Sequence, residues 1–465
     1  NPRVLGMQYA VRGPIVARAE ELRRALAAGE KAPFDEVVFC NIGNPHAVGG
    51  VPLTYVRQVL AGCVYPKTVL DMPEDVQKRV SRILKSTNGG GMGAYSESKG
   101  LATVRQSVAN FIAQRDQPNY IPVDVENIFL TEGASDGIKT LLSLIISSAR
   151  DGVMIPIPQY PLYSAAIDML GGSKIPYFLT EEENWSLQPA QLAQAVAAAK
   201  SSGTVPRALV VINPGNPTGQ VLSVDVMKEI VQFCEDNNLL LMADEVYQEN
   251  VYHKDRKPFV SFRSVVNGMR SSIELASFHS ISKGVFGECG LRGGYTELVN
   301  FSEVALREIY KCFSVSLCSN LPGQVVVDVM ASPPSPGDPS HSLFATEVQS
   351  RYAALQRKAV RVATALNTFP GVSCQPCDGA MYAFPRIAIP AKAVTAATEA
   401  KVAPDTFYCV RLLEETGICV VPGSGFGQMD GTFHFRMTFL PPEDKIDSVV
   451  ERIRYFHGNF LEQFG

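Results

Sequence analysis

The sequence is organised around one stretch, Phe278-His279-Ser280-Ile281-Ser282-Lys283-Gly284-Val285-Phe286-Gly287-Glu288-Cys289-Gly290-Leu291-Arg292. The apolar run from Ile273 to Phe278 predicts a buried strand, so Lys283 falls in the loop just beyond a strand end. Ligands of open α/β sheets bind at the carboxyl ends of strands. In a dry cleft a lysine amine loses part of its ammonium character and can attack a carbonyl carbon.

Two hydroxyls and a guanidinium flank this lysine, from Ser280, Ser282 and Arg292. Hydroxyls and a guanidinium all donate hydrogen bonds, and the planar guanidinium fork binds two oxygens of a phosphate at once. The stretch therefore favours a carbonyl cofactor that carries a phosphate group. The alternative is a solvated lysine in a Gly-rich loop.

Composition limits the classes of partner. The chain has 465 residues, of which 46% are apolar and 19% charged, which predicts a soluble globular protein with room for two domains. Its net charge of -4, with interspersed signs, offers no basic patch for nucleic acid and no polybasic arm for a membrane. No run approaches the roughly 18 apolar residues of a spanning helix. We expect neither nucleic acid nor membrane as a partner.

Ten cysteines without a spacing pattern are typical of the reduced thiols of an intracellular enzyme. One CxxC motif, Cys374 to Cys377, has no second pair and no histidine at ligand spacing, so we expect an ordinary loop and no metal site. The chain starts at Asn1, so a targeting peptide is not readable. The expected location is cytoplasmic or organellar, with mitochondrion and peroxisome both open.

Short apolar runs alternate with helical patterns through the middle of the chain. The predicted strands are Ile128–Leu130, Val153–Ile157, Ile175–Leu179, Ala208–Ile212, Leu239–Ala243 and Ile273–Phe278, and helices near 134–148, 160–170, 189–201 and 222–237 separate them. This alternation predicts an α/β fold whose large domain has a mainly parallel sheet covered by helices on both faces.

A proline-rich segment, Ser332 to Pro339, marks the expected domain boundary. Beyond it the pattern predicts a smaller α+β domain with helices near 341–368 and 404–416, strands near 380–384 and 432–439, and a last amphipathic helix. We expect an N-terminal arm that is partly joined to the small domain over 1–60, a large domain over 61–331 and the C-terminal small domain over 340–465.

Polar residues follow several of the predicted strands. Ala134 and Ser135 open a helix whose amides can receive a phosphate, although Ser135 also suits an ordinary helix cap. Tyr160 can lie on a heteroaromatic ring or pack in the core. Asn216 sits in a turn fixed by two prolines and two glycines. Asp244 ends an apolar strand, where its carboxylate needs a cation, either a protonated pyridine nitrogen or a structural ion pair.

In combination these motifs resemble the fold-type I aminotransferases of class I and II, which bind pyridoxal 5'-phosphate (PLP). The resemblance runs along nearly the whole chain. Within that group the alanine aminotransferases are the most similar, as judged from four strings: Tyr9–Ile15, Gly43-Asn44-Pro45-His46, Pro158–Ser164 and Pro422–Gln428. The plant-type glutamate:glyoxylate aminotransferases share most of these strings.

The resemblance implies a role for each site residue. Lys283 bonds to the cofactor aldehyde and, once substrate displaces it, moves the proton at Cα. Asp244 holds the pyridine nitrogen protonated. Asn216 and Tyr247 donate to the ring oxygen O3', and Tyr160 stacks on the ring. The phosphate is bound by Ala134, Ser135, Ser280 and Arg292, and by Tyr95 of a neighbouring subunit, which implies a homodimer.

Substrate recognition needs a second arginine. The predicted strand near 432–439 alternates, with Phe433, Phe435, Met437 and Phe439 toward the core and Arg436 on the other face. The resemblance implies that Arg436 binds the α-carboxylate, helped by the backbone of Gly43 and by Asn216; the alternative is an exposed surface arginine. Arg12 is a candidate for the distal carboxylate of 2-oxoglutarate.

The implied activity is transfer of an amino group between L-alanine and 2-oxoglutarate, giving pyruvate and L-glutamate, while PLP cycles through pyridoxamine phosphate. A glutamate:glyoxylate aminotransferase is the nearest alternative; the chain ends Gln463-Phe464-Gly465, with no Ser-Lys-Leu-type address. A PLP-dependent lyase and a catalytically silent PLP sensor are the alternatives from other classes.

Overall fold

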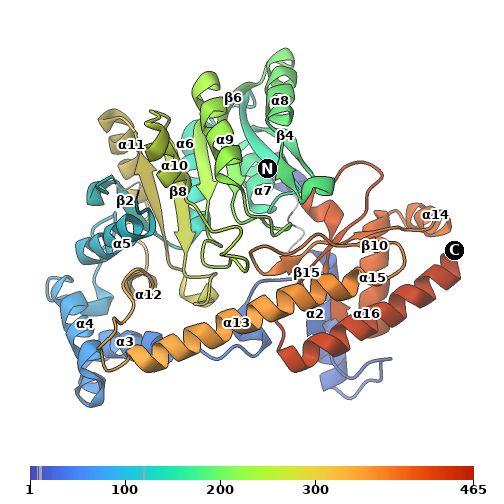
Figure 1. Cartoon of the computed structure of the whole chain (residues 1–465), viewed down its shortest axis with the longest axis horizontal. Helices are drawn as coiled ribbons and strands as arrows, with labels where there is room; N and C mark the ends of the chain where they lie inside the picture. Colours follow the sequence, from blue (N-terminus) through green and yellow to red (C-terminus); the bar gives the residue numbers. More distant parts are fainter. Residues whose placement is uncertain (8, 10–12, 119–120) are drawn as a thin grey trace.

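The computed structural model describes residues 1–7, 9, 13–118 and 121–465 (Figure 1). Its largest sheet has eight strands in the order β2-β9-β8-β7-β6-β3-β4-β5. The strands are β2 (Ile128–Thr131), β3 (Asp151–Ile157), β4 (Ser173–Thr180), β5 (Ser186–Leu187), β6 (Val205–Ile212), β7 (Leu240–Asp244), β8 (Leu275–Ser280) and β9 (Gly294–Val299). All six strands predicted for the large domain are confirmed. The pairs within the run β8-β7-β6-β3-β4 are parallel.

Two strands of the large sheet were not predicted from the sequence. The two-residue strand β5 and the longer β9 pair antiparallel with their neighbours. Strand β9 places Thr296 and Glu297 in the interior, and Glu297 there accepts a 2.7 Å hydrogen bond from Arg263. Buried polar residues of this kind remove the continuous apolar run that marks a strand covered on both faces.

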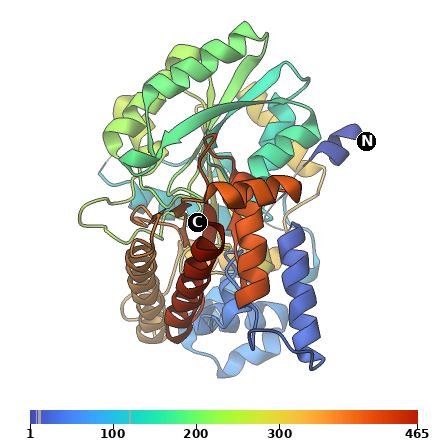
Figure 2. The ribbon, with the colours of Figure 1, turned by 90° about the vertical axis from the view of Figure 1, so that its right-hand side faces the viewer.

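Helices cover both faces of the large sheet (Figures 1 and 2). They are α5 (Ala102–Arg115), α6 (Ala134–Ile145), α7 (Leu162–Leu170), α8 (Pro189–Ser201), α9 (Val224–Asn237), α10 (Phe262–Met269), α11 (Glu303–Ser314) and α12 (Leu321–Ala331). Every residue of β7 and β8 is buried, as expected for strands between two helical layers.

A second group of elements surrounds three small sheets. Strand β1 (Val38–Phe39) pairs with β13 (Ile418–Cys419), β10 (Val372–Ser373) with β12 (Arg386–Ile387), and β15 (Phe435–Thr438) with both β11 (Tyr382–Ala383) and β14 (Val421–Pro422). The helices here are α2 (Pro14–Ala27), α13 (His341–Leu366), α14 (Ala391–Glu399), α15 (Pro404–Thr416) and α16 (Glu443–Phe464). The pairing of β1 with β13 joins the N-terminal segment to this group.

The remaining elements are α1 (Pro2–Gly6), α3 (Thr54–Val64), α4 (Glu74–Lys85) and the 3-10 turns η2 (Pro45–Val48), η3 (Pro66–Asp71), η4 (Gly91–Gly93), η5 (Val125–Asn127), η6 (Glu181–Glu183), η7 (Cys289–Leu291) and η8 (Gly423–Phe426). Helix α16 buries the apolar stripe that its sequence predicts, which includes Ile446, Ile453 and Phe460. Each such side chain contributes about 1.5–3 kcal/mol to folding.

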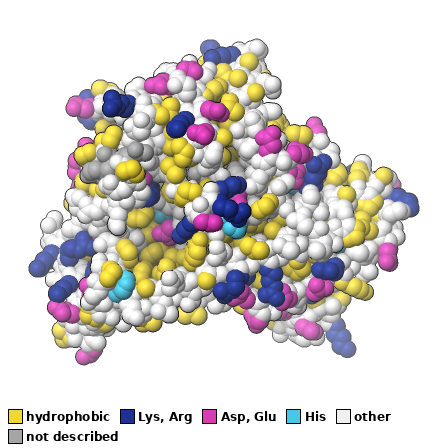
Figure 3. Space-filling model, in the orientation of Figure 1, with side chains coloured by type: hydrophobic (Ala, Val, Ile, Leu, Met, Phe, Trp, Pro, Cys, Tyr) yellow, Lys and Arg dark blue, Asp and Glu magenta, His cyan; other side chains and the backbone are white. Residues whose placement is uncertain are grey.

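The surface agrees with the mixed composition. Figure 3 shows acidic and basic side chains interspersed on one face, with hydrophobic side chains gathered in a hollow of that face. Within the described ranges, no helix combines the length and the hydrophobicity that crossing a membrane requires.

Candidate active site

The predicted site residues meet in one cavity of about 470 Å³ at the carboxyl ends of β6, β7 and β8. Eleven of the twelve line it: Gly43, Ala134, Ser135, Tyr160, Asn216, Asp244, Tyr247, Ser280, Lys283, Arg292 and Arg436. The twelfth, Tyr95, lies outside the cavity and is 77% exposed. Convergence from segments far apart in the chain is what a site at the carboxyl edge of a parallel sheet predicts.

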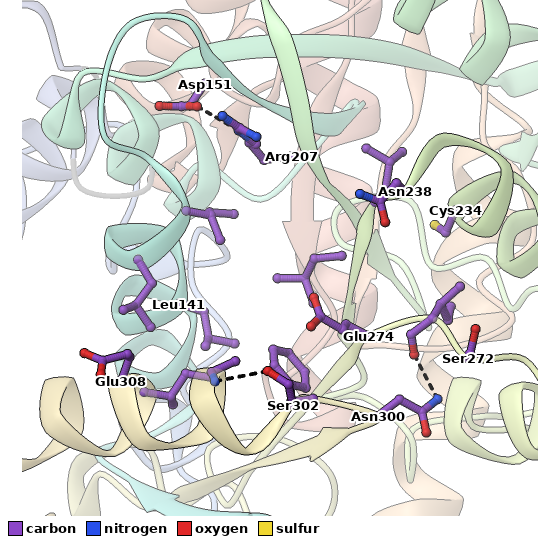
Figure 4. A pocket seen from close by; sticks show the side chains of 18 of the residues that line it. Leu141, Asp151, Arg207, Cys234, Asn238, Ser272, Glu274, Asn300, Ser302 and Glu308 are labelled. Atoms are coloured by element: carbon purple, nitrogen blue, oxygen red, sulfur yellow. Dashed lines mark hydrogen bonds and ion pairs between the residues drawn. The ribbon is translucent and has the colours of Figure 1, made fainter.

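A larger cavity of about 880 Å³ lies at the opposite end of the sheet, where β3 and β7 begin (Figure 4). Its charged side chains include Asp151 and Arg207, which satisfy each other through a 2.8 Å ion pair. None of the predicted site residues lines it. Size therefore does not identify the active site; the converging polar groups do.

Lys283 lines the smaller cavity. Its Nζ donates to the carbonyl oxygen of Gly43 at 3.3 Å and lies 5.8 Å from the centroid of the Tyr247 ring. The loop is held by Gly284, which has a φ of +66° and whose N–H donates to Asn250 Oδ1 at 2.8 Å. Among the ion pairs of the described ranges, none includes Lys283. The amine is therefore held in place without a carboxylate that would neutralise it.

Asp244 is a buried carboxylate at the end of β7. Its Oδ2 accepts a 2.8 Å hydrogen bond from the hydroxyl of Tyr163. Burial raises the pKa of Asp244 to about 6, although the hydrogen bond from Tyr163 and the charge of Lys283 act against the rise. No cationic side chain of the described residues forms an ion pair with this carboxylate. The position fits a cation supplied by a ligand, such as a protonated pyridine nitrogen.

An anion cradle forms where α6 begins. Arg292 brings Nη2 to 3.4 Å from Ser135 Oγ and Nη1 to 3.3 Å from Ser282 Oγ. Gly133 caps the helix with a φ of +79°, and a Cβ there would lie 2.6 Å from Arg292 Nη2. Ser280 Oγ donates to Gly293 O at 3.1 Å, so its hydroxyl must turn to face a ligand. Helix amides, hydroxyls and a guanidinium together fit a phosphate.

Arg436 is only 1% exposed, so the reading as a surface arginine is wrong. Its Nη1 donates to Asn216 Oδ1 at 3.1 Å and its Nη2 donates to the carbonyl oxygen of Asn41, whereas Nε finds no partner among the described residues. The guanidinium lies 4.1 Å from the centroid of the Tyr382 ring and 4.7 Å from that of Phe426. A buried guanidinium with only neutral partners fits an anionic substrate group.

The alternation of β15 was predicted correctly, but its environment was not. Phe435, Met437 and Phe439 are buried as expected, while Phe433 is only half-buried. The opposite face is equally buried, because His434, Arg436 and Thr438 all lie at most 1% exposed. The strand separates a hydrophobic core from the polar cavity, so neither face meets solvent.

Three tyrosines support the site beyond those that the sequence predicted: Tyr9 and Tyr382 line the cavity, and the buried Tyr163 lies behind Asp244. Tyr163 holds Asp244, Tyr9 shares a 2.9 Å hydroxyl contact with Tyr160, and the hydroxyl of Tyr382 accepts a 3.3 Å hydrogen bond from Tyr247. Tyr163 lies in the first turn of α7, three residues after Tyr160, and this closeness in sequence to a predicted site residue was the available signal. Tyr382 comes from a two-residue strand, and no local pattern points to it.

The prediction that Arg12 binds the distal carboxylate stays a prediction, because Arg12 lies outside the described residues. The two cysteines of the CxxC motif, Cys374 and Cys377, are both buried and free.

Comparison with known proteins identifies the family. The model of the aminotransferases of class I and II matches residues 66–453, and the chain belongs to this family. It is therefore a PLP-dependent aminotransferase, and the fit of the cavity to a pyridine nitrogen and a phosphate agrees with that cofactor.

The curated relatives carry a more specific name. The chain is 50% identical to alanine aminotransferase 2-like of Danio rerio over 100% of this chain and 85% of that protein. It is 49% identical to alanine aminotransferase 1 of Homo sapiens, over 100% and 95%. It is 50% identical to the probable mitochondrial alanine aminotransferase of Dictyostelium discoideum, over 99% and 88%.

Solved structures agree on the fold. An alanine aminotransferase from Pyrococcus furiosus superimposes with a TM-score of 0.77 at 22% identity, covering 99% of each chain. An aminotransferase from Escherichia coli gives a TM-score of 0.77 at 24% identity, covering 98% of each chain.

Proposed function

We propose that this protein moves the amino group between L-alanine and 2-oxoglutarate, giving pyruvate and L-glutamate. The observation that carries the proposal is one cavity that Lys283 lines together with the Arg292 cradle and a second arginine, Arg436, which has no carboxylate partner among the described residues. A phosphate-bearing cofactor and an amino-acid carboxylate need two such cationic positions. The alanine aminotransferases at 49–50% identity support the choice of substrates.

When bound, PLP supplies an aldehyde for the amine and a ring that accepts the electron pair left at the substrate Cα. Lys283 would hold the cofactor covalently and would move the proton at Cα, because its Nζ is the one lysine amine among the described residues that line the cavity. Asp244 keeps the ring nitrogen protonated. Tyr247 and the amide NH₂ of Asn216 donate to the ring oxygen; the other end of that amide, Oδ1, accepts from Arg436.

The remaining residues bind and orient. Arg292, Ser280, and the helix N-terminus at Ala134 and Ser135 hold the phosphate. Tyr160 covers the ring from the loop before α7, where its hydroxyl meets that of Tyr9. Arg436 binds the substrate carboxylate, and the backbone of Gly43 completes that side of the cavity.

The active unit that we propose is a homodimer. Large apolar side chains on α3 and η3, at the junction between them and in the segment after η4 are exposed in the single chain. Among them are Val64, Tyr65, Leu70 and Tyr95, which are 57–77% exposed. A second copy would cover them and bring its own Tyr95 to the phosphate. Exposed apolar side chains grouped on neighbouring elements are typical of an interface.

The domain division 1–60, 61–331 and 340–465 belongs to the same proposal. It is supported by the β1–β13 pairing and by the proline-rich connection at 332–339. A site inside the cell, cytoplasmic or organellar, is supported by the free thiols of the described chain and by the name of the mitochondrial relative.

A half-reaction tests the function. Purified protein loaded with PLP is mixed with single amino acids while the visible absorbance of the cofactor is followed. We expect L-alanine to convert the cofactor to its amine form and 2-oxoglutarate to restore it, with pyruvate and glutamate formed in equal amounts. Faster restoration by glyoxylate would favour the glutamate:glyoxylate alternative. A cofactor spectrum that no amino acid changes would contradict transamination and favour a sensor.

Arg436→Lys is expected to raise the KM of both L-alanine and 2-oxoglutarate by about 10²-fold, because an ammonium cannot form the two parallel hydrogen bonds of a guanidinium fork. Steady-state kinetics with each substrate varied in turn measures the change. Arg361→Lys, which alters a surface ion pair with Asp447, is the matched control and should keep both KM values. An unchanged KM in Arg436→Lys would exclude Arg436 from carboxylate binding.

Tyr95→Phe is expected to raise the Kd of PLP about tenfold, since a hydrogen bond to a charged group contributes about 1.5–3 kcal/mol. Spectroscopic titration of the cofactor-free protein gives the Kd, and sedimentation gives the oligomeric state. Tyr455→Phe, which removes the hydroxyl of a 73% exposed tyrosine on α16, should bind PLP normally. If Tyr95→Phe bound PLP with the Kd of the parent protein, and the parent protein sedimented as a monomer, the role of Tyr95 of a second subunit would be refuted.

A further inference from the structure

Tyr382 contacts both parts of the proposed site: Tyr247, which we assign to the cofactor, and Arg436, which we assign to the substrate carboxylate. It lies on β11, is 2% exposed, and lines the cavity together with Lys283 and Arg436. Among the tyrosines of the described chain, only Tyr382 has both a hydroxyl contact with Tyr247, a predicted cofactor residue, and a cation–π contact with Arg436, the predicted carboxylate residue. Its ring and its hydroxyl face different partners, so each can have its own effect.

The ring supports Arg436. The centre of the guanidinium lies 4.1 Å from the centroid of the Tyr382 ring, with Phe426 at 4.7 Å as the second aromatic contact. Contacts of this kind are stronger in a desolvated site than on the surface. Since the Nε of Arg436 has no hydrogen-bond partner among the described residues, the aromatic contacts help to hold the plane of the guanidinium.

The hydroxyl meets Tyr247. The two tyrosine oxygens lie 3.3 Å apart and the rings are nearly perpendicular, at 82°. Gly43 leaves room for this hydroxyl, because a Cβ at that position would collide with it. The same glycine carbonyl accepts the hydrogen bond from Lys283, so the hydroxyl, the amine and the backbone turn are packed together.

The acidity of the two phenols differs. Burial raises the pKa of Tyr382, but the positive charges of Lys283 and Arg436 and the hydrogen bond from Tyr247 outweigh it, and the pKa falls below its ordinary value. Burial raises the pKa of Tyr247 well above that value. A more acidic phenol is a stronger hydrogen-bond donor. Because a phenol has one proton, Tyr247 can donate to a cofactor oxygen only if it turns from donor to acceptor toward Tyr382.

We propose that Tyr382 is a positioning residue with two separable actions: its ring orients Arg436 for the substrate carboxylate, and its hydroxyl donates to Tyr247, which in turn donates to the cofactor ring oxygen. The proposal rests on the proposed roles of Arg436 and Tyr247. Hydrogen bonds in such a chain strengthen one another. These two hydrogen bonds in series, here called the relay, would stabilise negative charge on the ring oxygen of the bound cofactor. The nitrogen through which Lys283 would hold the cofactor would then lose its proton at a lower pH.

Tyr382→Phe and Tyr382→Leu separate the two actions. Tyr382→Phe keeps the ring and removes the hydroxyl. In the holoenzyme without substrate, the pH midpoint of the visible cofactor absorbance should rise by about 0.3–1 unit, because the relay is weakened by a fraction of one hydrogen bond. Its kcat should fall about threefold to tenfold, while its KM for L-alanine stays within about twofold. Tyr382→Leu should also raise the KM of both substrates about tenfold, because it removes the aromatic support.

The cofactor-free protein provides a readout that is independent of activity. Its ultraviolet titration should contain a tyrosine that ionises before the others, and Tyr382→Phe should lack it. Tyr352→Phe is the matched control, since it removes a hydroxyl that binds the backbone of Val251 outside the cavity. It should leave the midpoint, the kinetic constants and the early titration unchanged.

Each result supports or contradicts one part of the proposal. A midpoint that is unchanged or lower in Tyr382→Phe would overturn the relay, and an unchanged KM in Tyr382→Leu would overturn the support of Arg436. Because the absorbance titration uses no substrate, a different preferred amino acid would not alter it. Failure of the alanine assignment is therefore distinguishable from failure of the relay.

Discussion

Lys283→Ala should lower kcat by at least about 10³-fold with L-alanine and 2-oxoglutarate. Alanine removes the amine to which we assign both the covalent attachment and the transfer of the proton at Cα, and positioned acid–base groups alone contribute about 10²–10⁴-fold. The cavity offers no second amine, because Lys283 is the only lysine among its described lining residues. Burial also raises the pKa of the neighbouring Tyr247 well above its ordinary value, so that hydroxyl is a poor replacement base. Coupled assay of pyruvate formation measures the loss.

The same variant should still bind PLP, because the Arg292 cradle and Asp244 remain. We expect the cofactor to leave faster on dialysis, since only non-covalent contacts hold it. Lys200→Ala, at an exposed position in the last turn of α8, is the matched control and should keep full activity. A kcat within tenfold of the parent in Lys283→Ala would show that another group moves the proton.

Much of this site could be predicted because its residues follow strands. Runs such as Ala208–Ile212 are apolar throughout, which is typical of a parallel strand covered on both faces, and each run ends in a short polar turn. In a parallel sheet those turns share one edge. Asn216, Asp244 and Lys283 therefore fall together in the structure although they lie up to 67 positions apart in the sequence.

Residues that come from the small sheets were harder to predict. Strand β1 pairs with β13 through Val38 and Ile418, and Tyr382 is fixed by the pairing of β11 with Thr438 of β15. Strands of two residues carry no periodicity of their own; long-range contacts alone establish them. The role of Arg436 came from resemblance, and only the structure shows that its strand has no solvent-facing side.

Strand β9 shows the second limit of local patterns. Its Glu297 belongs to a buried polar group with Arg263 and Asp116, whereas the neighbouring Thr296 faces the other side of the sheet, next to Gly137. A buried ion pair of this kind depends on a partner from a distant helix, so a sequence window around β9 shows polar residues and no reason to bury them. Such strands are recognisable only when the partner is known.

Asp244→Asn should have opposite effects on stability and on turnover. In the cofactor-free protein, burial raises the pKa of Asp244 from 3.8 to about 6. A carboxyl with a raised folded-state pKa stabilises the fold below the unfolded pKa, near pH 4, and loses that contribution as the pH rises through about 6. At neutral pH the ionised carboxylate therefore costs the cofactor-free fold about 3 kcal/mol, since each pKa unit corresponds to about 1.4 kcal/mol.

Asparagine keeps the size of the side chain and an oxygen for Tyr163, but it removes the charge. The Tm of the cofactor-free variant, relative to the parent, should rise between pH 4 and pH 7 and then stay constant, with an increase of several degrees at pH 7. Turnover should fall by about 10²–10³-fold, the magnitude typical of losing one preorganised electrostatic contact, because no carboxylate then keeps the ring nitrogen protonated. Asp225→Asn, with a side chain that is 91% exposed, is the control for both measurements.

The paired outcome identifies the cause. If Asp244 were a structural ion-pair residue, its loss would lower the Tm of the cofactor-free protein together with turnover. If it is a cofactor residue that the fold buries without a cation, the Tm rises while turnover falls. With PLP added, we expect the parent protein to have a higher Tm than Asp244→Asn. The protonated ring nitrogen supplies a cation that pairs with the carboxylate of Asp244 but not with the neutral asparagine.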